Sequence, residues 1–141
     1  MRHVVFRLEK ERYALPLAAI REVLEPPGQL TRVPRAPTAV RGVINLRGRV
    51  VTLVDLSRLL GLPPAEVADE KIVLLDRGRR DLGLVVSGVD GIESIERILH
   101  APGRPDRSVR GVARLRGWAI TVLDPEGVDG AVAAAFGDGR L

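Results

Sequence analysis

Two stretches of the chain repeat one another: residues 40–56 read VRGVINLRGRVVTLVDL, and residues 109–125 read VRGVARLRGWAITVLDP. They are separated by 69 residues (109 minus 40), and nine of their 17 positions are identical. The same offset also aligns positions upstream without a gap, such as Val4 with Val73 and Leu15 with Leu84. Agreement at one constant offset over such a span predicts a tandem duplication, in which each copy makes up about half of the chain.

Each copy is predicted to be mostly strand. Residues 42–46 and 50–54 are rich in β-prone side chains and flank Arg47-Gly48, a spacing typical of a tight hairpin. Asp55 is a favourable N-cap for a short helix that ends near Leu60. Apolar residues at helical spacing predict one or two helical turns over residues 17–24. After the second copy of the hairpin, only residues 131–136 are expected to be helical.

About five short strands per copy predict a mainly β fold of two tandem five-stranded SH3-like or OB-like barrels with a few short helices. A length of 141 residues fits a single domain or two small ones that share a core. We therefore expect one domain over residues 1–141, made of two intertwined subdomains over about residues 1–69 and 70–141. A pseudo-two-fold axis would relate the two, and the seam between them is a natural place for a binding groove.

The composition argues against most kinds of chemistry. The chain has no cysteine, which excludes disulfides and thiolate metal sites, and its two histidines make a histidine-rich metal site unexpected. It contains neither a G-x-S-x-G nucleophile motif nor a Walker-type phosphate loop. We expect no enzymatic activity, no catalytic residues, no cofactor and no metal.

The cellular location follows from the apolar segments. No apolar run approaches the roughly 20 residues that span a bilayer. The N-terminus enters a strand directly, without the layout of a signal peptide. The sequence therefore predicts a cytoplasmic protein without direct membrane insertion.

Arginine dominates the positive charge. The formal net charge is +4, and all but two of the 22 basic residues are arginine. These arginines are interspersed with acidic residues, and aromatic residues make up only 3% of the chain. A small-barrel nucleic-acid binder is therefore the weaker alternative, because such proteins cluster positive charge among stacking aromatics.

Arg47 and Arg116 occupy matched hairpin tips, and each is followed by glycine. An arginine beside a tight glycine turn can direct its rigid donor fork at a carboxylate or at the C-terminus of a helix. The alternative interpretation is a solvated hairpin tip.

Three motifs occur in succession: a proline-containing loop from Arg32 to Pro37, the run GVINLRG at residues 42–48, and Val54-Asp55-Leu56. In these motifs the sequence resembles the CheW family of chemotaxis coupling proteins. The run DLGLVVSGV at residues 81–89 adds support, and the likeness covers about residues 3–125. It implies the double-barrel CheW-like fold and a non-enzymatic adaptor. Such an adaptor joins the cytoplasmic tips of methyl-accepting chemoreceptors to the regulatory domain of the histidine kinase CheA, in association with membrane receptor arrays.

The resemblance also implies which residues bind partners: Ile20, Glu22, Val23, Gly42, Ile44, Arg47, Gly83, Val86, Val89 and Ile92. Arg47 matches the arginine of the family's N-L-R-G motif. Residues 20–23 match one wall of the receptor groove and residues 83–92 the other, while Gly42 and Ile44 match the neighbourhood of a kinase contact. Ordinary core packing is the alternative for the apolar members of this set.

One departure from the family pattern bears on the role. The C-terminal helix expected of the family is predicted to be short here. An accessory module that binds a receptor or another partner without the kinase therefore remains the second hypothesis.

Overall fold

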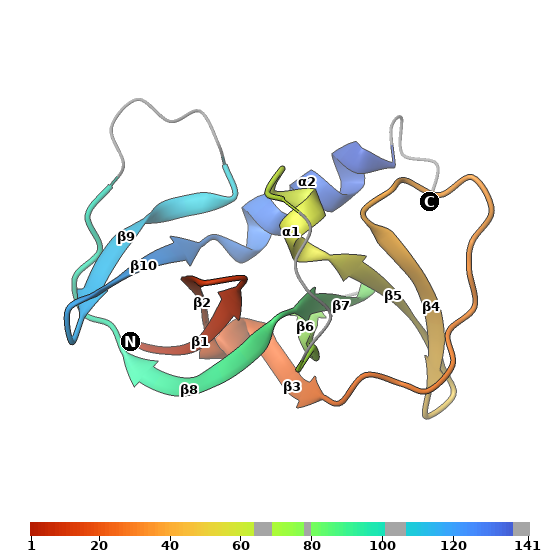
Figure 1. Cartoon of the computed structure of the whole chain (residues 1–141), viewed down its shortest axis with the longest axis horizontal. Helices are drawn as coiled ribbons and strands as arrows, with labels where there is room; N and C mark the ends of the chain where they lie inside the picture. Colours follow the sequence, from red (N-terminus) through yellow and green to blue (C-terminus); the bar gives the residue numbers. More distant parts are fainter. Residues whose placement is uncertain (64–68, 78–79, 101–106, 137–141) are drawn as a thin grey trace.

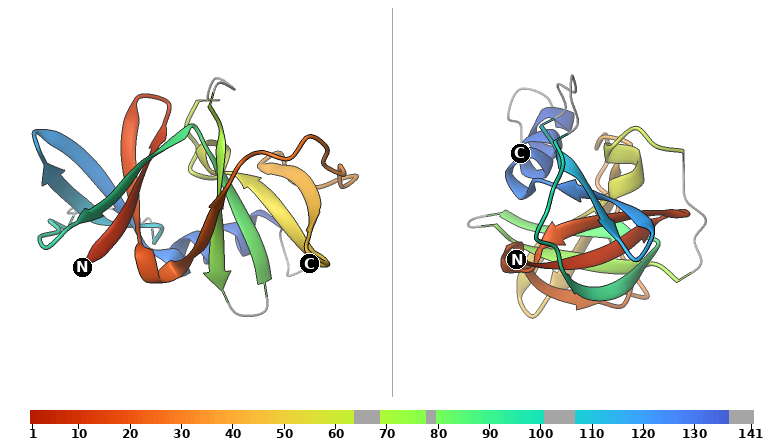
Figure 2. Two further views of the ribbon diagram at one scale, coloured as in Figure 1. Left: turned by 90° about the horizontal axis from the view of Figure 1, so that it is seen from below. Right: turned by 90° about the vertical axis from the view of Figure 1, so that its left-hand side faces the viewer.

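The computed structural model describes residues 1–63, 69–77, 80–100 and 107–136. Its strands form two five-stranded sheets that lie side by side (Figures 1 and 2). The strands of the first sheet are β1 (Arg2–Leu8), β2 (Glu11–Pro16), β8 (Gly88–Ser94), β9 (Val109–Leu115) and β10 (Trp118–Leu123). The strands of the second sheet are β3 (Ile20–Leu24), β4 (Val40–Leu46), β5 (Arg49–Asp55), β6 (Lys71–Arg77) and β7 (Arg80–Val86). The predicted mainly β fold with two five-stranded subdomains is confirmed.

The strand order of the two sheets reflects the sequence repeat. The order is β8-β1-β2-β10-β9 in the first sheet and β3-β6-β7-β5-β4 in the second. Under the 69-residue offset, β1 corresponds to β6, because they begin at residues 2 and 71, and β4 corresponds to β9, because they begin at residues 40 and 109. Applied to every strand, this correspondence converts one order into the other. The internal pseudo-symmetry predicted from the sequence is therefore present in the topology.

The repeat alone led us to expect one subdomain on each side of residue 69. The two sheets do not follow that division. Each sheet combines the first two strands of one copy with the last three strands of the other. Strand β2 pairs in parallel with β10, and β5 pairs in parallel with β7. These pairings join the two copies, since each copy's first hairpin completes the other copy's sheet.

The main hydrophobic core lies between the sheets. Phe6 and Leu15 of the first sheet share one buried cluster with Val73 and Leu84 of the second. Two smaller clusters lie within the individual sheets. Such shared apolar burial stabilises both sheets together, and a copy alone would bury much less.

Two helices, α1 (Leu56–Leu59) and α2 (Pro125–Ala135), cover this core on one side (Figure 1). The short 3-10 helix η1 (Leu17–Ala19) connects β2 to β3. Figure 1 shows α2 running from the first sheet across to the second. Its buried residues Val128 and Val132 belong to the central cluster.

Two predictions of local structure are corrected. Residues 17–24 were expected to be helical, but only η1 is, and β3 follows because it pairs with β6 about fifty residues away. The C-terminal helix begins at Pro125 and not at residue 131. Proline is favoured at the first helical position, where its missing N–H needs no partner, and Asp124 accepts a hydrogen bond from the Glu126 N–H. The helix is therefore not shortened in the way the sequence suggested.

Candidate functional site

Arg47 and Gly48 form the two-residue loop between β4 and β5, as the sequence predicted. Leu46 pairs with Arg49, which leaves only these two residues in the turn. Both have positive φ, 51° at Arg47 and 85° at Gly48, the backbone geometry of a type I′ hairpin. The side chain of Asn45 accepts a hydrogen bond of 2.9 Å from the Gly48 N–H. A short turn between paired strands therefore fixes the base of the Arg47 side chain.

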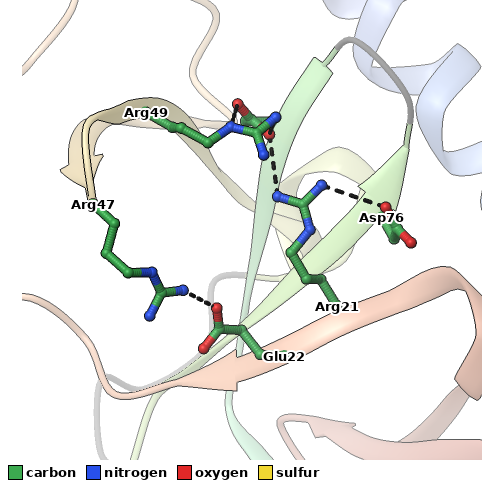
Figure 3. Close-up of polar contacts among 6 residues, drawn as sticks. Arg21, Glu22, Arg47, Arg49 and Asp76 are labelled. Carbon is green, nitrogen blue, oxygen red and sulfur yellow. Dashed lines mark hydrogen bonds and ion pairs between the residues drawn. The ribbon is translucent and has the colours of Figure 1, made fainter.

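Arg47 is exposed and forms an ion pair with Glu22 of the edge strand β3 (Figure 3). Its side chain is 67% exposed, against 32% for Glu22. The pair links the tip of the β4–β5 hairpin to the opposite edge of the same sheet. The structure thus brings together two of the predicted site residues that are 25 positions apart in the chain.

A second charged group lies beside this pair. Arg21 reaches Asp76 at 3.3 Å and Asp81 at 3.5 Å, and Arg49 donates to Asp81 at 3.0 Å. Figure 3 shows Arg21, Arg49 and Asp76 projecting from β3, β5 and β6 toward one another. Asp81 is only 13% exposed, so two arginines compensate a largely buried carboxylate.

The first sheet carries the equivalent hairpin. Arg116 and Gly117 join β9 to β10, with φ values of 48° and 81°. Arg116 donates to both carboxylate oxygens of Glu93 at 2.7 and 2.9 Å. These hydrogen bonds raise the pKa of Arg116. Glu93 therefore pairs with Arg116 as Glu22 pairs with Arg47, although the 69-residue offset does not align the two glutamates.

A small hollow adjoins each arginine hairpin, with a volume of about 200 Å³ in both cases. The second-sheet hollow is lined by Arg21, Leu46, Arg47, Arg49, Val51, Leu74 and Asp81. The first-sheet hollow is lined by Asp90, Leu115, Arg116, Trp118, Ile120, Val5, Arg12 and Glu93. Each of the seven residues that line the second-sheet hollow has a counterpart in the first-sheet hollow whose residue number differs by 69. Glu93 is the one additional residue of the first-sheet hollow. The duplication has therefore produced two equivalent hollows, one on each sheet.

The two hollows carry the same ion pair with opposite polarity. In the first-sheet hollow, Arg12 lies 3.2 Å from Asp90. The equivalent positions in the second-sheet hollow are Asp81 (12 plus 69) and Arg21 (90 minus 69). This inversion follows from the offset, so the sequence contained the signal, but our sequence analysis did not apply the offset to charged residues.

A further difference between the hollows is aromatic. Trp118 occupies the position equivalent to Arg49, and its side chain is largely exposed. The Arg12 guanidinium lies 3.6 Å above the centre of the Trp118 ring, which is a cation–π contact. The sequence analysis did not predict this contact, because it depends on the pairing of β2 with β10.

The other predicted partner-binding residues fall into two groups. Val23 is 40% exposed on β3, and Ile92 is 49% exposed at the equivalent position of β8. The remaining residues are buried or half-buried, and they contribute mainly to the core: Ile20, Gly42, Ile44, Gly83, Val86 and Val89. A Cβ on Gly83 would lie 2.8 Å from Ile72 and 2.9 Å from Leu53, which accounts for glycine there by packing alone.

The described part of the chain contains no group of three or more histidine, cysteine, aspartate or glutamate side chains placed to hold a metal ion. Nor does it contain a helix with the length and apolar character needed to cross a bilayer.

Two intertwined five-stranded sheets with matched arginine hairpins define a class of small β-rich domains. The chain belongs to the CheW family, because the model of the CheW-like domain matches residues 2–130. The family resemblance expected from the sequence is thereby confirmed.

Individual relatives agree with this assignment. The chain is 32% identical over 133 residues to the chemotaxis protein CheW of Rhizobium meliloti (strain 1021), which covers 89% of this chain and 84% of that protein. It is 27% identical to the chemotaxis protein CheW of Thermotoga maritima, covering 84% of this chain and 81% of that protein. Two other relatives, from Rhizobium etli and Klebsiella aerogenes, are matched over only 59% and 61% of their length.

A solved structure has the same fold. The crystal structure of the scaffolding protein TtCheW from Thermoanaerobacter tengcongensis superposes with a TM-score of 0.80 at 26% identity. The match covers 87% of this chain and 88% of that one.

Proposed function

We propose that this protein is a chemosensory adaptor that couples methyl-accepting chemoreceptors to a CheA-type histidine kinase at receptor arrays in the cytoplasm. The observation that carries the proposal is the exposed Arg47 on a rigid two-residue turn, within the N-L-R-G motif of a CheW-like domain. The named relatives are chemotaxis proteins, and the structural neighbour is described as a scaffolding protein.

Arg47 is well suited to exchange its partner. Its ion pair with Glu22 is largely solvated, and exposed pairs of this kind contribute only about 0.2–1 kcal/mol. A carboxylate on a partner protein can therefore replace Glu22 at little cost. A contact that excludes water would strengthen the new hydrogen bonds, since charge-assisted bonds gain most where the dielectric is low.

The edge strands supply apolar contacts for a helical receptor tip. Val23 on β3 and Ile92 on β8 are exposed at equivalent positions of the two sheets. A helix with an apolar stripe can pack against such side chains, while flanking charges set its orientation.

The two arginine hairpins are not interchangeable docking ends. The first-sheet hollow has Trp118 and the second-sheet hollow has Arg49, and their partly exposed ion pairs have opposite polarity. A partner whose charges complement one end therefore meets like charges at the other, which disfavours the wrong orientation.

Binding to separately purified partners tests the proposal. We expect the protein to bind both the regulatory domain of the cognate kinase and a receptor cytoplasmic fragment, and Arg47→Glu to weaken kinase binding at least tenfold in titration calorimetry. Arg114→Glu is the matched control, since Arg114 is an exposed arginine of the first sheet away from the Arg47 tip. Absence of binding to either partner by the folded wild-type protein would contradict the proposal. Binding to the receptor alone would select the accessory role.

A further inference from the structure

The segment between β3 and β4 borders a groove that is separate from the arginine hairpin tips. This segment runs along the outer margin of the second sheet (Figure 1). The groove has a volume of about 660 Å³ and is lined by Leu30, Arg32, Val33, Ala36, Pro37, Thr38, Val40, Arg41 and Arg58. We call it the proline-loop groove. Its lining includes neither Arg47 nor Glu22.

The charge of the groove is positive and only partly compensated. Three arginines line it, and none of the described residues in its lining is acidic. The charge of Arg41 is neutralised by two carboxylates that do not line the groove. Arg41 lies 2.7 Å from Glu70 and 3.3 Å from Asp55, whose side chains are 12% and 8% exposed. The hydrogen bond to Glu70 raises the pKa of Arg41.

Arg32 and Arg58 supply the available charge. Arg58 has only a distant contact with Asp55, at 3.9 Å, and its side chain is 45% exposed. Arg32 is exposed and has no acidic partner among the described residues. Both guanidinium groups are therefore free to bind a carboxylate, which they can match with two parallel hydrogen bonds.

Apart from Thr38, the remaining described lining of the groove is aliphatic. Leu30 and Val33 are 39% and 41% exposed and border the same groove. Ala36, Pro37 and Val40 extend this surface, and no aromatic side chain among the described residues lines it. A nucleic acid would leave this surface unused, because sequence-independent binding of its bases relies on aromatic stacking.

We propose that the proline-loop groove binds an acidic peptide segment of a partner protein, in which a glutamate or aspartate stands beside an aliphatic side chain. The carboxylates pair with Arg32 and Arg58, and the aliphatic side chain packs on Leu30 and Val33. The volume lies within the range of ligand-binding clefts and exceeds what a single carboxylate would fill. This site adds to the Arg47 end and does not depend on it.

Fluorescence anisotropy with a short fluorescein-labelled peptide of alternating glutamate and leucine tests the site. We expect binding to the full-length protein that weakens about tenfold in Arg32→Glu and several-fold in Arg58→Gln, because each removes a charge-assisted contact. Val33→Ser should weaken binding several-fold without changing the net charge. A peptide with glutamine in place of glutamate should bind at least tenfold more weakly.

Three controls decide the outcome. Arg114→Glu carries the same charge change outside the groove and should bind within twofold of the wild type; an equal loss in Arg114→Glu and Arg32→Glu would reduce the binding to general charge attraction and overturn the proposal. Arg47→Glu should also bind the peptide within twofold, so failure here is distinct from failure of the coupling function. Tighter binding of a duplex DNA, with loss of peptide binding in its presence, would overturn the choice of a peptide. Absence of peptide binding by the wild type would overturn the site itself.

Discussion

The backbone of Arg47 is strained, since a φ of 51° is unfavourable for residues other than glycine. We predict that Arg47→Gly changes the free energy of unfolding by less than about 0.5 kcal/mol, because relief of strain offsets the lost ion pair and the greater freedom of the unfolded chain. Arg47→Val should cost about 1–2 kcal/mol, because a β-branched residue tolerates this φ poorly. Urea unfolding of both variants measures the difference. Equal stability of the two variants would show that the turn relaxes.

Gly42 and Gly83 belong to the predicted binding set but are enclosed by protein. A Cβ on Gly42 would lie 2.5 Å from the Thr31 carbonyl oxygen, a backbone atom. The contacts of Gly83 are side chains that can shift. We predict that Gly42→Ala destabilises the protein more than Gly83→Ala, for which about 1–3 kcal/mol is expected from overpacking. Thermal unfolding tests the order, and the reverse order would contradict the packing argument.

His3 makes stability depend on pH. It is fully buried in β1 and its Nδ1 contacts the Met1 carbonyl oxygen, while Nε2 has no partner in the described structure. Burial lowers the pKa of His3, the N-terminal ammonium and Arg110 act in the same direction, and the Met1 hydrogen bond and Glu96 oppose them. The unfolded state therefore binds a proton more readily than the folded state.

The sign of the effect follows from this difference. Stability is unaffected by His3 above the unfolded pKa of about 6.5, and it declines as the pH falls from there toward the lower folded pKa. We predict that denaturant midpoints fall between pH 7 and 5 and that His3→Gln flattens this slope. His100→Gln is the matched control, since His100 is exposed, and an unchanged slope in His3→Gln would refute the assignment.

At the scale of elements, the C-terminal helix α2 is a structural part of the core. Val128 is fully buried in the cluster that both sheets share. We predict that Val128→Ala lowers the free energy of unfolding by about 1–3 kcal/mol, through lost burial and the cavity left behind. Ala134→Ser, on the exposed side of the helix, should stay within about 0.5 kcal/mol. Equal effects in urea unfolding would mean that α2 contributes little to the core.

The elements that were predicted well are those that local chemistry determines. The hairpin at Arg47-Gly48 and the helix capped by Asp55 depend on neighbours within a few residues, and both are present. Strand β3 was mistaken for a helix because its apolar spacing fits either, and its pairing with β6 decides between them. Arg47 could be singled out from the sequence. Its ion pair with Glu22 could not, because the two residues are brought together by contacts between distant parts of the chain. The same holds for the charge inversion between the hollows.

At the scale of the whole molecule, the exchange of hairpins makes the two copies interdependent. A fragment of residues 1–69 has β1 and β2 without the rest of the first sheet, and β3 without the neighbouring β6. We predict that fragments 1–69 and 70–141 are each unfolded alone and regain β structure when mixed, as measured by circular dichroism and amide hydrogen exchange. A fragment that folds by itself would show that each copy keeps an independent core.

The parallel pairing of β2 with β10 also has a consequence for synthesis on the ribosome. Residues 12–14 can pair with residues 120–122 only after this later segment, more than a hundred positions further along the chain, has been synthesised. The second sheet, whose strands all lie between residues 20 and 86, can assemble first, and the first sheet closes only after β10 has been synthesised. A chain released before β10 therefore carries the Arg47 hairpin without the Arg116 hairpin, and both hairpins are in place only once the two sheets are complete.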